Sequence, residues 1–155
     1  MIVTAAFVLA AITSPSDVSR QLTAQAEALL QIEKKVTAKP ELQSDLYEDV
    51  LTLLDSAIDA DEGNVHAHAL EASVLLLKSD NGDGTYDVCY LQDARDEAKA
   101  VLTNTSHGSA ADVAAANAVL SDIAAIPAAA IPDSASTCDD NERQSHGAKA
   151  SFRAR

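Results

Sequence analysis

Residues 57–72 read AIDADEGNVHAHALEA, and the other predicted helices are arranged around this stretch. Its first half continues a helical pattern, Gly63 and Asn64 turn the chain, and a second helical pattern opens at Val65. Glycine commonly ends one helix, and asparagine commonly caps the next through its side-chain oxygen. The stretch therefore predicts two helices joined by a tight turn, which is the building element of helical scaffolds.

Apolar residues recur every three or four positions on both sides of this turn, as expected for helices with one buried face. The segment after the turn is apolar on nearly every side, which indicates the central helix of the core. We expect helices over about residues 14–39, 42–60, 65–78, 91–102 and 109–126. The sequence thus predicts an all-α fold, either a right-handed stack of helical hairpins with five helices or a small helical bundle.

Composition and charge restrict the function. Only 3% of residues are aromatic and Trp is absent, which suits tight helix packing better than an aromatic-lined pocket. The net charge of -13 argues against nucleic acid as a partner, because phosphate binding needs a Lys/Arg surface. Residues 41–97 hold 15 Asp and Glu against Lys78 and Arg95, so their balance equals the charge of the whole chain. This acidity is either a solvated face or a surface that attracts a cation or a basic partner.

The two ends of the chain differ from the helical domain, which we place at residues 14–126. Residues 1–13 are apolar and too short to span a bilayer, so they predict a secretory signal or an N-terminal apolar helix. Residues 127–155 predict a Pro/Ala linker followed by a disordered tail. A cleaved signal would give a periplasmic or secreted protein with no integral membrane span; the alternative location is the cytoplasm.

Cys89 and Cys138 are the only cysteines. If the protein is exported to an oxidising compartment, we expect them to form a disulfide. In a reducing cytosol they would remain two thiols. Two cysteines without paired spacing do not suggest a structural zinc site.

The hairpin resembles the tetratricopeptide repeat, which has small residues where its helices cross and Asn at the turn between units. The similarity covers about residues 47–102, and its central positions are Ala57, Ile58, Asn64, Ala67 and Ala72. His68 and Glu71 stand where the family has Trp and Leu, and the loop after residue 78 is longer than the family's. The resemblance implies a concave surface that grips a peptide or protein segment, and no catalysis.

Residues 79–90 resemble the calcium loop of EF-hand and dockerin-like proteins, with Gly84 at its sixth position. The resemblance implies these calcium ligands: Asn81, Asp83, the Thr85 carbonyl and Asp87. Ser79 and Tyr90 occupy the positions of the two strongest anionic ligands. The loop is therefore either a weak calcium site or a pair of Gly turns, with a short strand over residues 85–90 as a further alternative.

No catalytic pattern stands out in the chain. His66 and His68 lie two apart, so on a helix they point to different faces and cannot chelate one metal. No nucleophile elbow or phosphate-binding Gly loop occurs. We therefore expect no enzyme activity, and no cofactor unless the loop takes calcium. An enzyme or inhibitor that uses the acidic face is the least supported alternative.

The sequence predicts a non-enzymatic scaffold or adaptor that binds a protein or peptide partner, for which a basic segment would be the electrostatic match. Its predicted partner face consists of Asp55, Asp59, Glu62 and His66. The alternative function is a calcium-stabilised, exported structural module with the metal in the loop at residues 79–90.

Overall fold

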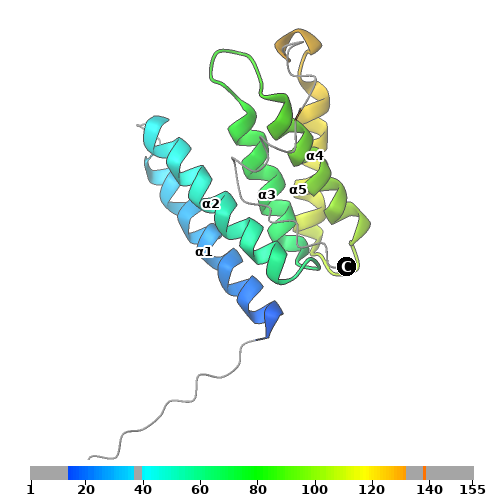
Figure 1. Ribbon diagram of the computed structural model, residues 1–155. Coiled ribbons are helices and arrows are strands. Elements are labelled where there is room, and N and C mark those ends of the chain that lie inside the picture. The colour runs from blue at the N-terminus through cyan, green and yellow to red at the C-terminus, as the bar shows by residue number, and fades with distance from the viewer. Residues whose placement is uncertain (1–13, 37–39, 132–137, 139–155) are drawn as a thin grey trace, which may run out of the picture.

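The computed structural model describes residues 14–36, 40–131 and 138. This part of the chain is all-α, as predicted, and its helices run alternately up and down (Figure 1). The helices are α1 Pro15–Val36, α2 Pro40–Ala60, α3 Val65–Ser79, α4 Val88–Thr103, α5 Ala110–Ala125 and the short 3-10 helix η1 Ala128–Ala130. Within the described ranges, the only β-type pairing is one isolated bridge between Asp80 and Tyr86.

The helices form two antiparallel hairpins and a fifth helix. α1 packs along α2 and α3 packs along α4, while α5 lies against both α3 and α4 (Figure 1). α3 also contacts α2, so it joins the two hairpins and occupies the centre of the bundle, as predicted. α5 packs along α3 as well, and α1 reaches the start of α3 through polar side chains.

Small aliphatic residues build the core. The largest fully buried apolar side chains are Leu54, Val50, Val65, Val74 and Val101. Between them lie alanines with no exposed surface, namely Ala26, Ala57, Ala67, Ala72, Ala94, Ala98 and Ala116. Because an alanine side chain is a single methyl group, helices can approach closely at these positions, and interiors are packed about as densely as organic crystals. The Ala-rich composition is therefore explained by close helix crossings.

Capping side chains set the helix starts. A capping box begins α5, in which the Ser109 side chain accepts from the Asp112 N–H and the Asp112 side chain accepts from the Ser109 N–H. One cap was not predicted: Asp87 accepts from the backbone N–H of Cys89 at 2.8 Å. This cap begins α4 at Val88, ahead of the expected start at residue 91, so the alternative of a strand over residues 85–90 is wrong.

The segment after α5 stays ordered for longer than its prolines suggested. η1 follows Pro127, and Ile131 packs against the core. The backbone N–H of Tyr86 donates to the carbonyl of Ala130 at 2.9 Å, which ties this segment to the loop before α4. The prediction for residues 1–13, and the linker and tail prediction where it covers residues 132–137 and 139–155, lie outside the described residues.

A disulfide joins Cys89, in the first turn of α4, to Cys138, with a Cα–Cα distance of 5.4 Å. The predicted pairing is therefore confirmed. Among the described helices, none combines the length and the apolar character that a membrane crossing requires.

The disulfide is expected to contribute strongly to stability. Its partners are 49 positions apart. Closing a loop of that size removes conformational entropy from the unfolded chain, which raises the free energy of the unfolded state by about 4 kcal/mol. The double variant Cys89→Ser, Cys138→Ser should therefore lose up to about 4 kcal/mol of unfolding free energy, measured by urea denaturation. Equal stability of the variant and the oxidised protein would contradict this expectation.

Candidate functional site

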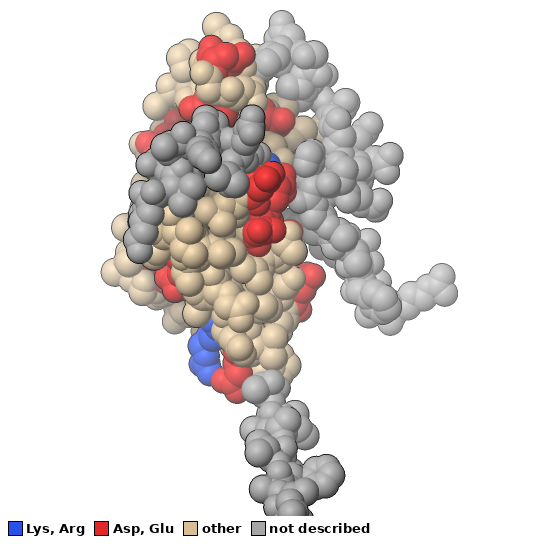
Figure 2. All heavy atoms as spheres, turned by 90° about the vertical axis from the view of Figure 1, so that its left-hand side faces the viewer, with Lys and Arg blue, Asp and Glu red and all other residues tan. Residues whose placement is uncertain are grey.

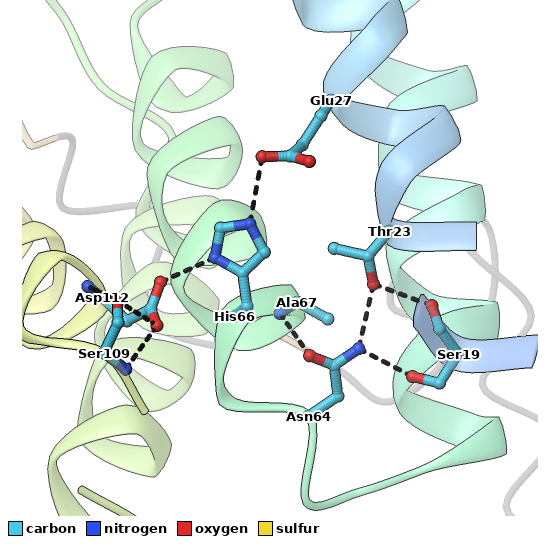
Figure 3. A network of polar contacts seen from close by, with 8 residues as sticks. All are labelled: Ser19, Thr23, Glu27, Asn64, His66, Ala67, Ser109 and Asp112. Atoms are coloured by element: carbon cyan, nitrogen blue, oxygen red, sulfur yellow. Dashed lines mark hydrogen bonds and ion pairs between the residues drawn. The ribbon is translucent and has the colours of Figure 1, made fainter. Parts of the chain in front are cut away.

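One end of the bundle holds a network of polar side chains that joins α1, α3 and α5. It is the lower end in Figure 1, where α1 and α5 begin and α2 turns into α3. Figure 3 shows this network, which we name the polar junction. Its side chains belong to Ser19, Thr23, Glu27, Asn64, His66, Ser109 and Asp112.

Asn64 links α3 to α1. Its side-chain oxygen accepts from the N–H of Ala67 at 3.1 Å, which caps α3 as predicted. Its amide nitrogen donates to Ser19 Oγ at 2.7 Å and to Thr23 Oγ1 at 2.9 Å (Figure 3). The two hydroxyls donate their own protons to the carbonyls of Ala57 and Ser19. Ser19 and Thr23 are only 0% and 3% exposed, so these bonds satisfy groups that would each cost about 1–3 kcal/mol if left unpaired.

His66 links α3 to α1 and α5 on the other side of the junction. Its Nδ1 lies 2.6 Å from Asp112 Oδ1, and its Nε2 lies 3.0 Å from Glu27 Oε1 (Figure 3). Both partners are carboxylates, which accept hydrogen bonds when ionised. A ring that donates from both nitrogens carries two protons, so the geometry favours the imidazolium form.

The pKa values agree with that geometry. Burial would lower the pKa of His66, but the hydrogen bonds from its ring to Asp112 and Glu27 raise it above its ordinary value. For Asp112, burial would raise the pKa, but the hydrogen bonds from His66 and Ser109 lower it. Each group therefore stabilises the charged form of the other. The His66 side chain is 45% exposed, so solvent screening limits the strength of this pairing.

The α4–α5 connection brings Asp112 to His66. Gly108 lies so close to Val65 that a Cβ at Gly108 would sit 2.6 Å from Val65 Cγ1. Only glycine fits this approach without a shift of the neighbouring chain. The next residue, Ser109, caps α5 and holds the Asp112 carboxylate through its backbone N–H at 2.8 Å. Asp112 is thus positioned by its own helix start before it meets the histidine.

The polar junction engages the groups that could transfer a proton. A general base needs a ring nitrogen within hydrogen-bond reach of the proton that it removes. Both nitrogens of His66 face carboxylates, and the Ser109 hydroxyl donates to Asp112 at 2.7 Å. The contacts instead join three helices, so the polar junction is a device that holds the bundle together.

His68 makes a second histidine–carboxylate contact on another face of α3, as the two-residue spacing predicted. Its Nδ1 lies 2.5 Å from Glu97 Oε2 on α4, and its Nε2 donates to the Glu62 carbonyl at 3.1 Å. His68 is 8% exposed. The two histidines therefore fix the beginning of α3 to α1, α4, α5 and the preceding turn.

The predicted partner face is divided between two environments. Asp55 and Asp59 lie one turn apart on α2, and Asp59 is exposed. Glu62 is exposed in the turn before α3, whereas both ring nitrogens of His66 are engaged in the polar junction. Of the predicted acids, Asp59 lies on the exposed side of α2 and Glu62 lies in the turn that follows it.

Within residues 45–60 of α2, the exposed positions form one stripe, because they recur at spacings of three and four. They are Asp45, Asp49, Thr52, Ser56 and Asp59. The helix contains no Lys or Arg. Lys78 reaches Glu48 from α3 and forms an ion pair at the edge of this acidic stripe. Figure 2 views the α1–α2 side, where Lys and Arg atoms are sparse among the described residues.

The loop at residues 79–90 is closed by its own hydrogen bonds. Asp83 Oδ1 accepts from the Thr85 N–H at 2.9 Å, Asn81 Nδ2 donates to Thr85 Oγ1 at 3.0 Å, and Asp87 caps α4. Gly82 and Gly84 adopt positive φ angles of 76° and 87°, which glycine accepts readily. In the described part of the chain, no group of three or more His, Cys, Asp or Glu is arranged to hold a metal ion. The calcium site stays a prediction.

Sequence inspection did not find Ser19, Thr23 or Glu27 as functional candidates. Their partners Asn64 and His66 lie 39 to 45 positions away in the chain, so no local spacing could reveal the contacts. The capping box of α5 was visible in the sequence, but the second role of its acid was not.

Replacement of Asn64 by alanine should destabilise the protein by about 2 kcal/mol, since the cap and the link to α1 are lost together. Asn64→Asp keeps the capping oxygen but removes both N–H donors. Its unfolding free energy should therefore lie between those of the unchanged protein and of Asn64→Ala. Asn117→Ala is the control, because Asn117 is exposed and its side chain bonds only within α5. Urea denaturation measures all four proteins, and equal losses for Asn64→Ala and Asn117→Ala would contradict the assigned role.

The His66 contacts should make stability depend on pH. Because folding raises the pKa of His66, its contribution is fully present below the unfolded value of 6.5 and is lost as pH rises through the folded value. Between about pH 5.5 and 8.5, the stability advantage of the protein over His66→Gln should therefore shrink. A difference for His66→Gln that stays constant with pH would exclude the proposed protonation.

Comparison with known proteins gives no assignment: no family model matches the chain, and no curated protein or solved structure matches it either. The resemblances to the tetratricopeptide repeat and to calcium loops therefore stay predictions from the sequence. The shape and chemistry of the chain itself carry the functional argument.

Proposed function

We propose that the protein is a non-enzymatic scaffold whose α2 surface binds a basic segment of a partner protein. The observation that carries this proposal is the acidic stripe of α2 defined above, on a helix without a single Lys or Arg. An exposed stripe of one charge sign attracts segments of the opposite sign and accelerates their encounter.

The dimensions of the stripe suit a peptide. From residue 45 to residue 59, a helix extends about 21 Å at 1.5 Å per residue. An extended partner segment of about six residues covers that length. Lys or Arg at alternate positions of such a segment would lie on one side and face the acids of α2.

A rigid support favours this role. α2 packs between α1 and α3, and the polar junction ties both of these neighbours together at the end where α2 stops. A binding surface that is already ordered loses less conformational freedom on association. The disulfide adds support for export to an oxidising compartment, where such bonds persist.

The alternative of a calcium-stabilised module has no comparable observation in its favour. In this loop, Asp83 and Asp87 accept from N–H groups of Thr85 and Cys89, and the described residues contain no group of three or more His, Cys, Asp or Glu placed to hold a metal ion.

Charge reversal on α2 tests the proposal. A fluorescein-labelled peptide of alternating Arg and Ala should bind the protein in a fluorescence anisotropy titration, and binding should weaken as salt screens the charges. Asp59→Lys should reduce its affinity about fivefold, which corresponds to roughly 1 kcal/mol for one exposed charge contact. The double variant Asp49→Lys, Asp59→Lys should reduce the affinity further.

The matched control is Asp96→Lys, which makes the same charge change at an exposed position of α4. An equal loss of affinity in Asp59→Lys and Asp96→Lys would show that net charge, and not the α2 stripe, governs binding. Unchanged affinity in the double variant would rule out the stripe as the binding surface.

A further inference from the structure

A small cavity opens at the end of the bundle opposite the polar junction. Its volume is about 220 Å³. It lies where α3 and α5 end, beside the loop before α4, at the upper end in Figure 1. The lining residues are Leu76, Leu77, Asp80, Tyr86, Asp122 and Ile126.

The cavity is electrostatically negative. Asp80 and Asp122 line it, and none of its lining residues within the described ranges 14–36, 40–131 and 138 is Lys, Arg or His. Both carboxylates stand at C-terminal helix ends, where the helix dipoles add partial negative charge. Lys78, in the last turn of α3, does not compensate them, since it pairs with Glu48 and lies 5.3 Å from the centre of the Tyr90 ring.

The walls between these acids are apolar. Leu76, Leu77 and Ile126 supply aliphatic surface, and Tyr86 supplies a ring. Leu77 is 55% exposed, so its side chain is available for contact. Pockets for drug-sized ligands measure about 300–1,000 Å³, so this cavity is of a size for one long side chain.

The wall formed by the loop is held in place. Asp80 and Tyr86 pair through a β-bridge, and the Asp87 N–H donates to the carbonyl of Ser79 at 2.8 Å. On its other side, Tyr86 donates to Ala130 at 2.9 Å. A preformed cavity needs little reorganisation to accept a ligand.

We propose that this cavity receives an arginine side chain of the partner protein. The guanidinium group would lie between Asp80 and Asp122, with the aliphatic stem against Leu76 and Leu77. Arginine fits better than lysine, because its planar group can contact carboxylates with several N–H donors and also stack on the ring of Tyr86. This inference rests on the proposed function, to which it adds a second, sequence-specific contact away from α2.

The test uses the whole protein and a minimal probe, N-acetyl-arginine amide, followed by two-dimensional ¹H–¹⁵N NMR. Saturable shifts are expected at the backbone amides of Leu77, Tyr86 and Ile126. N-acetyl-citrulline amide has nearly the same shape without the charge and should cause shifts at least tenfold smaller at equal concentration.

The variants Asp122→Asn and Asp80→Asn should each weaken the response, and Asp80→Asn retains an oxygen to accept from the Gly82 N–H. Asp96→Asn, on the exposed side of α4, should respond like the unchanged protein. Equal shifts with citrulline, or an unaltered response in both cavity variants, would overturn the inference. Arginine-induced shifts confined to α2 would do the same while leaving the proposed function intact.

The peptide titration also distinguishes binding at the α2 stripe from arginine binding in the cavity. If Asp49→Lys, Asp59→Lys leaves the peptide's affinity unchanged while cavity shifts with the arginine probe persist, the proposed α2 surface fails and the cavity stands. If the double variant weakens the peptide and the cavity residues never respond to the probe, the cavity fails alone.

Discussion

The side-chain amide of Asn64 is the contact on which the arrangement of the helices depends most. Through its oxygen it starts α3, and through its nitrogen it holds two buried hydroxyls of α1. A buried polar group is costly unless every partner is in place. Sliding α1 along α2 by even one residue would separate these partners, whereas an interface of alanine and leucine would tolerate the slide. The apolar core thus holds the helices together, and the Asn64 amide fixes the position of α1 along its neighbours.

The two ends of the bundle are secured by different chemistry. At the end with the polar junction, hydrogen bonds and histidine–carboxylate pairs connect α3 to its neighbours. At the opposite end, the disulfide and the Tyr86–Ala130 backbone bond hold the loop and η1 in place. The histidine–carboxylate pairs at the first end depend on pH and salt, whereas the disulfide at the other end is broken by reduction. The central helix is therefore constrained at both ends, while the acidic stripe of α2 between them is left to solvent.

The local features of the fold were accessible from the sequence, because they depend on residues within one turn of each other. Asn64 and Ser109 are of residue types that commonly cap helix starts. The spacing of the apolar residues locates α1, α2 and α3. Asp87 was missed as a cap because the glycines before it favoured a longer loop. The His66 contacts were not accessible, since Glu27 and Asp112 reach it from helices whose placement only the packed structure provides. The acidic residues of α2 could be counted in the sequence. Their alignment into one exposed stripe could be recognised only once the structure showed which face of α2 is buried.

The disulfide divides the chain into two mechanically different parts. Residues between Cys89 and Cys138, which include α4 and α5, form a covalent ring, whereas α1, α2 and α3 belong to an open strand. If the oxidised chain were pulled from its two ends, only the residues outside the disulfide loop could unfold and extend. The 49 positions enclosed by the bridge would withhold about 170 Å of extended length, at roughly 3.4 Å per residue. A single proteolytic cut in the α4–α5 connection would likewise leave both pieces attached, so that the fifth helix cannot drift away from the bundle.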